Sequence, residues 1–219
     1  MPRKQFDLIV FDWDGTLMDS TGTIVASMQA AARDLGLPVP DDRSASHVIG
    51  LGLQDAMQLV LPDLDAKSYP RMIERYRYHY LAQDQTLKLF DGVKEMLDDL
   101  ASQGYFLAVA TGKTRVGLSR ALSTVGLMSV FDSTRCADET FSKPHPAMLQ
   151  EIIRELGQDM QRTVMIGDTT HDLRMAGNAG AAGVGVQYGA HPRHELEALS
   201  PLYCASSVAE LHTWLNEYA

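Results

Sequence analysis

Two aspartates separated by a single residue, Asp12 and Asp14, follow the first apolar segment of the chain and directly precede Gly15 and Thr16. Carboxylates at this spacing can attack an electrophile, carry a proton or bind a divalent cation. An Asp pair before Gly is also typical of an ordinary turn. Its meaning therefore depends on the other polar residues that the fold brings to the same place.

Three further polar groups have comparable positions in the sequence. Thr111 and Gly112 end a second apolar segment, Asp168 ends a third, and Lys143 lies between them, before a proline. Taken singly, Thr111 and Asp168 could each cap a helix, and Lys143 could lie in a solvated loop. Taken together, their order and spacing indicate one site.

This set of residues matches what phosphoryl transfer requires. A phosphomonoester is a dianion, so a carboxylate approaches it only when cations neutralise the charge. Asp12 is the candidate nucleophile, and Asp14 would protonate the leaving oxygen and then activate water. Lys143 would pair with Asp12 and the phosphoryl oxygens, to which Thr111 and the amide of Gly112 would donate hydrogen bonds.

The same residues predict a Mg²⁺ site, because magnesium prefers oxygen ligands. Asp12 and Asp168 would supply carboxylates, and the main-chain carbonyl of Asp14 a third oxygen. Asp172, four residues after Asp168 on the same helical face, would bind through water or from the second shell of ligands. Gly15 would allow a sharp turn after Asp14 that lets the amides of Gly15 and Thr16 face the phosphate.

Short apolar segments bounded by turn residues predict buried strands over 6–11, 106–110 and 163–166, with shorter ones near 183–187 and 202–204. Apolar residues at helical spacing, including Val116, predict helices over 93–100, 116–125 and 148–156, and a last helix over 208–218. This alternation predicts an α/β fold with a doubly wound, Rossmann-like parallel sheet. In such a sheet ligands bind where the strands end.

Residues 17–87 interrupt the alternation with helical patterns over 24–35, 53–61 and 69–81. We therefore predict a catalytic core of residues 1–16 and 88–219 that carries an inserted, all-helical cap of residues 17–87. Gly50 and Gly52 lie in a loop of the cap, 49–54, and would let the backbone approach a substrate. The alternative is a plain turn between two helices.

The segments 12–20, 111–112, 143–144 and 167–172 resemble the four motifs of the haloacid dehalogenase superfamily, and the insertion resembles the cap of its phosphoglycolate phosphatase and β-phosphoglucomutase branch. The resemblance implies Asp12 as nucleophile, Asp14 as acid and base, Lys143 as stabiliser, and magnesium on Asp12, Asp14 and Asp168. Trp13 and Lys113 depart mildly from the pattern. Dehalogenase members lack the second aspartate of the first motif, so its presence favours phosphate chemistry.

The resulting expectation is a Mg²⁺-dependent phosphohydrolase that acts on a small phosphorylated metabolite, with phosphoglycolate phosphatase as the nearest named activity. A β-phosphoglucomutase-like mutase and an inorganic pyrophosphatase remain alternatives, although residues 47–50 lack the Arg or Lys expected of the mutase. A receiver-type phosphoacceptor domain would be shorter, would lack a cap, and would carry its phosphoacceptor on a later strand.

The 219-residue chain has a formal net charge of −9, which argues against nucleic acid or an anionic membrane as a partner. Cys136 and Cys204 form no metal or redox motif, so we expect both to be reduced. The apolar segment after Arg3 and Lys4 is too short for a signal peptide, and no segment is long enough to span a membrane. These features predict a cytoplasmic protein, and they leave the choice between monomer and dimer open.

Overall fold

The computed structural model describes residues 5–219, so the first four residues of the predicted core, including Arg3 and Lys4, lie outside the described residues. Six parallel strands form one sheet in the order β3-β2-β1-β4-β5-β6. The predicted doubly wound α/β fold is confirmed. The strands are β1 (Leu8–Phe11), β2 (Phe106–Thr111), β3 (Ser133–Cys136), β4 (Thr163–Gly167), β5 (Ala182–Val186) and β6 (Tyr203–Ala205).

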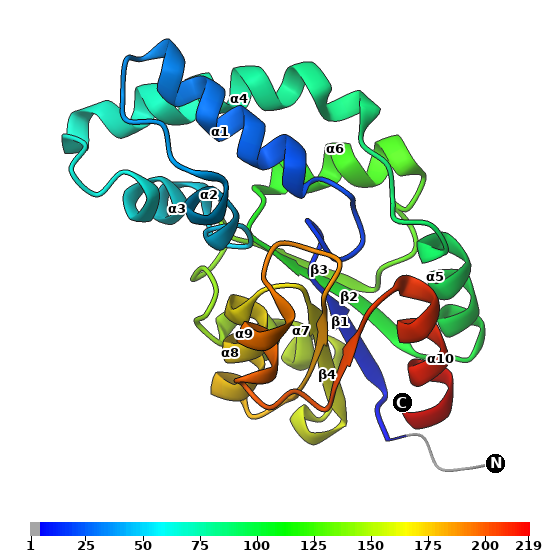
Figure 1. Ribbon diagram of the computed structural model, residues 1–219. Coiled ribbons are helices and arrows are strands. Elements are labelled where there is room, and N and C mark those ends of the chain that lie inside the picture. Colours follow the sequence, from blue (N-terminus) through cyan, green and yellow to red (C-terminus); the bar gives the residue numbers. More distant parts are fainter. Residues whose placement is uncertain (1–4) are drawn as a thin grey trace.

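Helices cover both faces of the sheet, and further helices lie beyond the carboxyl ends of its strands (Figure 1). The core helices are α5 (Val93–Ser102), α6 (Arg115–Val125), α7 (Ala147–Leu156), α8 (Thr170–Ala179), α9 (Arg193–Glu197) and α10 (Val208–Tyr218). The inserted segment forms α1 (Thr21–Asp34), α2 (Asp42–His47), α3 (Leu53–Val60) and α4 (Tyr69–Gln83). Single 3-10 turns lie at Ala66–Ser68, Asp84–Thr86 and Met160–Arg162.

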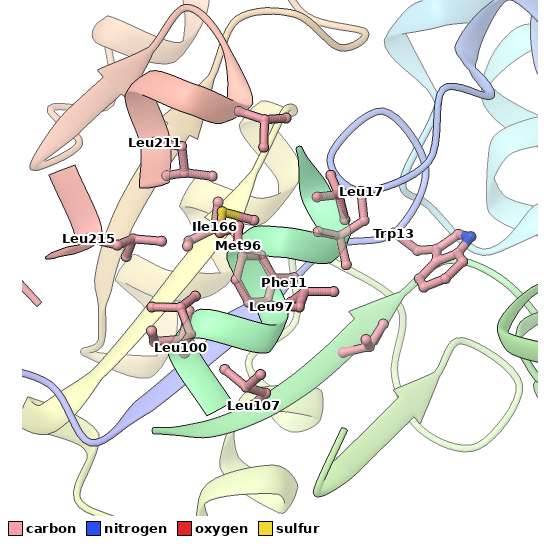
Figure 2. Close-up of a cluster of buried hydrophobic side chains, with 14 of the residues drawn as sticks. Phe11, Trp13, Leu17, Met96, Leu97, Leu100, Leu107, Ile166, Leu211 and Leu215 are labelled. Atoms are coloured by element: carbon pink, nitrogen blue, oxygen red, sulfur yellow. The ribbon is translucent and has the colours of Figure 1, made fainter. Parts of the chain in front are cut away.

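Strand β1 lies at the centre of the sheet, and its four residues are all buried. Its side chains alternate between two hydrophobic clusters, as the period of two along a strand requires. Ile9 and Phe11 pack with residues of α5, α6 and α10, whereas Leu8 and Val10 pack with residues of α7 and α8. Figure 2 shows Phe11 among side chains of the first cluster. Burial on both faces explains why the strand is a continuous apolar segment.

The predicted core helices are confirmed, and α6, α7 and α8 each end at a glycine with positive φ: Gly126, Gly157 and Gly180. A glycine takes this left-handed conformation without the steric cost of a Cβ. The assignment of Val116 to the buried face of its helix is wrong, because its side chain is 72 % exposed.

Three elements were not predicted: β3, α2 and α9. β3 is an edge strand with the sequence Ser-Thr-Arg-Cys, so it lacks the apolar segment that marks the central strands. Its Arg135 pairs with Glu151 and Glu155 on α7 at 2.9 and 2.8 Å, which attaches the strand to a helix through charges. The two helices have only six and five residues, and both are mostly polar.

Helices α1 to α4 share a cluster of buried residues of their own, distinct from those beside the sheet. α1 and α4 lie side by side beyond the carboxyl ends of the strands (Figure 1). We call residues 17–87 the cap, as predicted; the division at these residues stays a prediction. Within residues 5–219, no helix has both the length and the apolar character needed to cross a membrane.

Leu97→Ala tests the contribution of α5 to the sheet-facing core. Leu97 is fully buried beside β1, so we expect the free energy of unfolding to fall by about 2–5 kcal/mol through lost contacts and a residual cavity. Urea denaturation measures this change, with Leu202→Ala as the control, because Leu202 is 53 % exposed. Equal losses in the two variants would contradict the packing described here.

Candidate active site

The carboxyl ends of three neighbouring strands bring the predicted polar residues together. Asp12 directly follows β1, Thr111 ends β2, and Asp168 directly follows β4. Lys143 comes from the loop between β3 and α7. Parallel strands end at one edge of the sheet, so residues more than a hundred positions apart in sequence meet there.

Lys143 lies between two carboxylates in the buried interior of this edge. Its Nζ is 2.6 Å from Asp12 Oδ1 and 2.7 Å from Asp172 Oδ1, and all three side chains are almost wholly buried. Burial alone would lower the pKa of Lys143, but the negative charges of Asp12 and Asp172 outweigh it and raise the pKa above its ordinary range. The lysine therefore stays protonated and supplies the positive charge of the site.

Asp12, Asp168 and Asp172 form a buried acidic cluster, with one carboxylate oxygen of each within 4.8 Å of the others. Asp168 Oδ1 accepts a hydrogen bond from the Thr16 hydroxyl at 2.9 Å, and its Oδ2 accepts one from the Ala190 amide at 2.7 Å. Asp12 Oδ2 is buried and has no hydrogen-bond partner among the described residues.

Burial raises the pKa of Asp12 well above its ordinary value, although the charge of Lys143 opposes this shift. Burial and the charge of Asp172 raise the pKa of Asp168 to about 7. One lysine thus does not compensate three buried carboxylates. Oxygen donors, excess negative charge and an unpartnered Asp12 oxygen all fit a divalent cation of the magnesium type.

Asp14 has different surroundings, although only one residue separates it from Asp12. Its Oδ1 accepts a hydrogen bond from the Ser20 hydroxyl at 2.6 Å and lies 3.0 Å from Lys113 Nζ. The Asp14 carboxylate is not part of the acidic cluster. Its role as a metal ligand, through the main-chain carbonyl, stays a prediction.

Lys113 is a residue of the site that sequence reasoning treated only as a departure from a motif. Its Nζ also donates to the Tyr80 hydroxyl of α4 at 2.9 Å, so it connects Asp14 to the cap. Burial opposes the charge of Lys113, but Asp14 and Tyr80 outweigh it, and its pKa is raised. Its position directly after the predicted Thr111-Gly112 pair was the available signal.

The loop after β1 packs against Asp168 of the acidic cluster, and its amides donate within the loop. The Gly15 amide donates to the Met18 carbonyl at 2.9 Å, and the Thr16 amide to the Trp13 carbonyl at 3.4 Å. These amides donate within the loop, so their contact with a phosphate stays a prediction. Gly15 has a φ of +80°, and a Cβ on it would lie 2.2 Å from Asp168 Oδ2. A Cβ on Gly189, a residue that was not predicted, would also lie 2.2 Å from Asp168 Oδ2.

The predicted cap loop reaches the site. A Cβ on Gly50 would lie 3.3 Å from Thr169 Oγ1 and 4.0 Å from Asp12 Oδ2, and the Gly52 amide donates to the Ser142 hydroxyl at 2.7 Å. A Cβ on Gly112 would lie 2.3 Å from the carbonyl oxygen of Leu51, so only glycine permits this approach.

The parallel sheet with an acidic cluster and a buried lysine at its carboxyl edge defines a hydrolase-like site of the α/β class. The family model for haloacid dehalogenase-like hydrolases matches residues 9–186. The chain therefore belongs to the haloacid dehalogenase-like hydrolase family, as its motifs predicted.

Named relatives cover nearly the whole chain. It is 39 % identical over 210 residues to a Dickeya dadantii protein named "Probable phosphatase IndB", covering 93 % of this chain and 91 % of that one. It is 33 % identical over 194 residues to a phosphoglycolate phosphatase of Agrobacterium fabrum, covering 85 % and 83 % of the two chains. A crystal structure titled as a predicted phosphatase from Clostridium acetobutylicum aligns with a TM-score of 0.86 at 27 % identity, covering 98 % and 100 %.

Gly15→Ala tests the support of Asp168 by the neighbouring loop. The added Cβ must displace the Asp168 carboxylate, so we expect Mg²⁺ affinity, measured by calorimetric titration, to fall by about tenfold to a hundredfold. Gly36→Ala is the matched control, because Gly36 also has positive φ but a Cβ there would meet nothing within 4 Å. Unchanged affinity in Gly15→Ala would show that Asp168 is not positioned by this contact.

Competition between protons and Mg²⁺ gives a second prediction. Without metal, folded Asp168 keeps its proton up to about pH 7, whereas the unfolded chain releases it near the ordinary value of 3.8. The folded state binds more protons in that window, so the contribution of Asp168 to stability falls as pH rises through it. Mg²⁺ needs the ionised carboxylate, so its affinity should fall about tenfold per pH unit below about pH 7.

Thermal unfolding with and without Mg²⁺, between about pH 5 and about pH 8, measures this competition. The rise in melting temperature on adding Mg²⁺ should grow with pH in the native chain. Asp168→Asn removes one of the two carboxylates whose pKa is raised, so it should reduce that growth, while Asp12 still titrates. A Mg²⁺ effect that is the same at both ends of the range would contradict the assignment.

Proposed function

We propose that the protein is a Mg²⁺-dependent phosphatase that hydrolyses the phosphomonoester of a small metabolite through an aspartyl-phosphate on Asp12. One observation carries the proposal. Two carboxylates only two positions apart have opposite surroundings, since Asp12 is buried beside Lys143, while Asp14 lines an open cavity next to Lys113. Carboxylates in different surroundings can act as nucleophile and as proton carrier in the same reaction.

In the first step, an Asp12 oxygen forms a bond to phosphorus while the bond from phosphorus to the leaving oxygen breaks. Asp14 is an ionised partner of Lys113 in the substrate-free chain, so it must bind a proton before this step; it then donates that proton to the leaving oxygen and becomes a carboxylate again. In the second step, Asp14 takes a proton from water, whose oxygen attacks phosphorus and releases Asp12. The chain thereby returns to the protonation state in which the first step began, with inorganic phosphate and an alcohol as products.

Lys143 keeps Asp12 oriented and favours its ionised form, and Asp172 orients Lys143 from the opposite side. A bound Mg²⁺, held by Asp12 and Asp168 with Asp172 nearby, would neutralise charge on the phosphoryl oxygens. Thr111 and the Gly112 amide would donate to the same oxygens. The cap loop over 49–54, which approaches Asp12 and Gly112, would limit access of water to the phosphoryl group.

The relatives named phosphatase and phosphoglycolate phosphatase support phosphate-ester hydrolysis over dehalogenation. The substrate we propose is a small phosphorylated metabolite, and the proposed location is the cytoplasm. We propose neither nucleic acid nor a membrane as a partner, because the formal net charge of −9 argues against both.

Asp12→Asn tests the nucleophile directly. The amide is isosteric but cannot form the aspartyl-phosphate, so we expect hydrolysis of small phosphate esters to fall by at least about a thousandfold. Circular dichroism checks that the variant is folded, and chelation of Mg²⁺ should abolish the activity of the native chain. Substantial residual hydrolysis by the folded variant would exclude Asp12 from this role.

A partition experiment distinguishes the covalent route from direct attack by water. With glycerol added, a shared aspartyl-phosphate divides between water and glycerol in a ratio that is independent of the original leaving group. Esters with different alcohols should therefore give the same proportion of glycerol phosphate to inorganic phosphate. Ratios that change with the ester would contradict a common intermediate.

A further inference from the structure

A cavity of about 470 Å³ extends from the candidate active site into the space between cap and core. Asp14, Gly112 and Lys113 line its inner part, so a group placed there would be in contact with the proposed proton carrier. The leaving alcohol of a phosphomonoester would lie on this side of the phosphorus, because Asp14 protonates its oxygen. The cavity is therefore the place for the remainder of the substrate.

The walls of the cavity are mostly apolar. Tyr76 and Tyr80 of α4 stack on each other with ring centroids 5.8 Å apart and planes 24° apart. The Tyr80 ring is in contact with both Tyr76 and Lys113, whose Nζ is 4.8 Å from the ring centroid. Aromatic side chains and the polarisable Met28 in the walls favour contact with another apolar ring. The other apolar side chains that line the cavity include Ile24, Met28, Leu53, Ala56, Leu81 and Val116.

The cavity is larger than a two-carbon acid such as glycolate requires. Its volume is about three times that of a cavity of about 150 Å³ that binds benzene. With a glycolate group bound, water would fill most of that space. The apolar walls would then contribute nothing to the affinity for the substrate. Binding pockets of this size and character hold ligands with many apolar atoms and a few oriented polar groups.

The two tyrosines remain neutral, so they add no charge to the walls. Burial raises the pKa of Tyr80 to about 12, and the nearby Asp14 charge acts in the same direction. The cation at the inner end, Lys113, is already engaged by Asp14 and Tyr80. Arg120, which also lines the cavity, is paired with Asp84. Arg77 and Asp138 line the cavity as well, so its walls are largely apolar and carry a few charged groups.

We infer that the natural substrates are phosphomonoesters whose alcohol carries a largely apolar group, of aromatic character, that packs in this cavity. The inference rests on the proposed phosphatase function and narrows its substrate class. It assigns Leu53, Tyr76 and Tyr80 to selection of the leaving group, separately from the residues that act on phosphorus.

Two alkyl phosphates of similar chemical reactivity test the inference. Phenethyl phosphate and ethyl phosphate differ in a phenyl ring that is remote from the ester oxygen. Burial of that ring should raise kcat/KM for phenethyl phosphate over ethyl phosphate by about tenfold to a hundredfold. Phosphoglycolate should resemble ethyl phosphate in kcat/KM.

Tryptophan substitutions inside and outside the cavity test whether the preference for phenethyl phosphate arises there. Leu53→Trp on α3 fills the cavity, so the ratio of the two kcat/KM values should fall toward one. Leu59→Trp, on the same helix but 63 % exposed and away from the cavity, should leave the ratio unchanged. Val116→Trp, at an exposed position that lines the cavity, repeats the test without disturbing a buried residue.

The outcomes separate the two proposals. If ethyl phosphate and phosphoglycolate are hydrolysed as efficiently as phenethyl phosphate, and both cavity variants leave the ratio unchanged, the inference is overturned while the phosphatase function stands. If the native chain with Mg²⁺ hydrolyses none of the three esters, the phosphatase function itself is overturned, and the inference with it.

Discussion

The ion pairs of Lys143 with Asp12 and Asp172 are the interactions on which the rest of the site depends. A buried carboxylate without a partner is costly, and this fold buries three of them at one edge of the sheet. Only a cation delivered from another segment, the loop before α7, makes that cluster tolerable. The remaining excess of negative charge is what prepares the site for a divalent cation. Burial of the three carboxylates thus lowers the stability of the metal-free chain and, for the same reason, raises its affinity for a divalent cation.

The turn at Gly15 gives the two aspartates after β1 different surroundings. The chain turns at Gly15, so Asp12 points into the acidic cluster while Asp14 meets Ser20 and Lys113. Lys113 in turn contacts Tyr80, which belongs to the cap. The proposed proton carrier is therefore attached to the cap, both directly through Ser20 and through Lys113, whereas the proposed nucleophile is paired with Lys143 of the core.

The central strands and the polar residues at their ends could be predicted because burial on both faces leaves continuous apolar segments. β3 could not, since an edge strand held by Arg135 and two glutamates has no such pattern. Lys113 was missed as a contact of Asp14, because the contact depends on how the β2 loop meets the β1 loop. The close approach of Gly189 to Asp168 likewise joins segments that no local periodicity connects. Contacts between distant loops depend on the order of the strands in the sheet. The sequence predicted a doubly wound parallel sheet but not that order.

Val116 shows that helical spacing of apolar residues does not by itself identify a buried position. Its helical spacing suggested a core position, but its side chain lines the cavity between core and cap. The cavity also shares residues with the buried cluster of the cap, since Ile24, Met28 and Ala56 belong to both. The same side chains thus hold the cap helices together and form the wall that meets the leaving group. Selection among substrates is therefore coupled to the packing of the cap. The chemistry at phosphorus depends mainly on the sheet edge, but Tyr80 of the cap reaches the proposed proton carrier through Lys113. A cap repacked around other residues would therefore change which alcohol is accepted and, where Tyr80 is replaced, the surroundings of Asp14 as well.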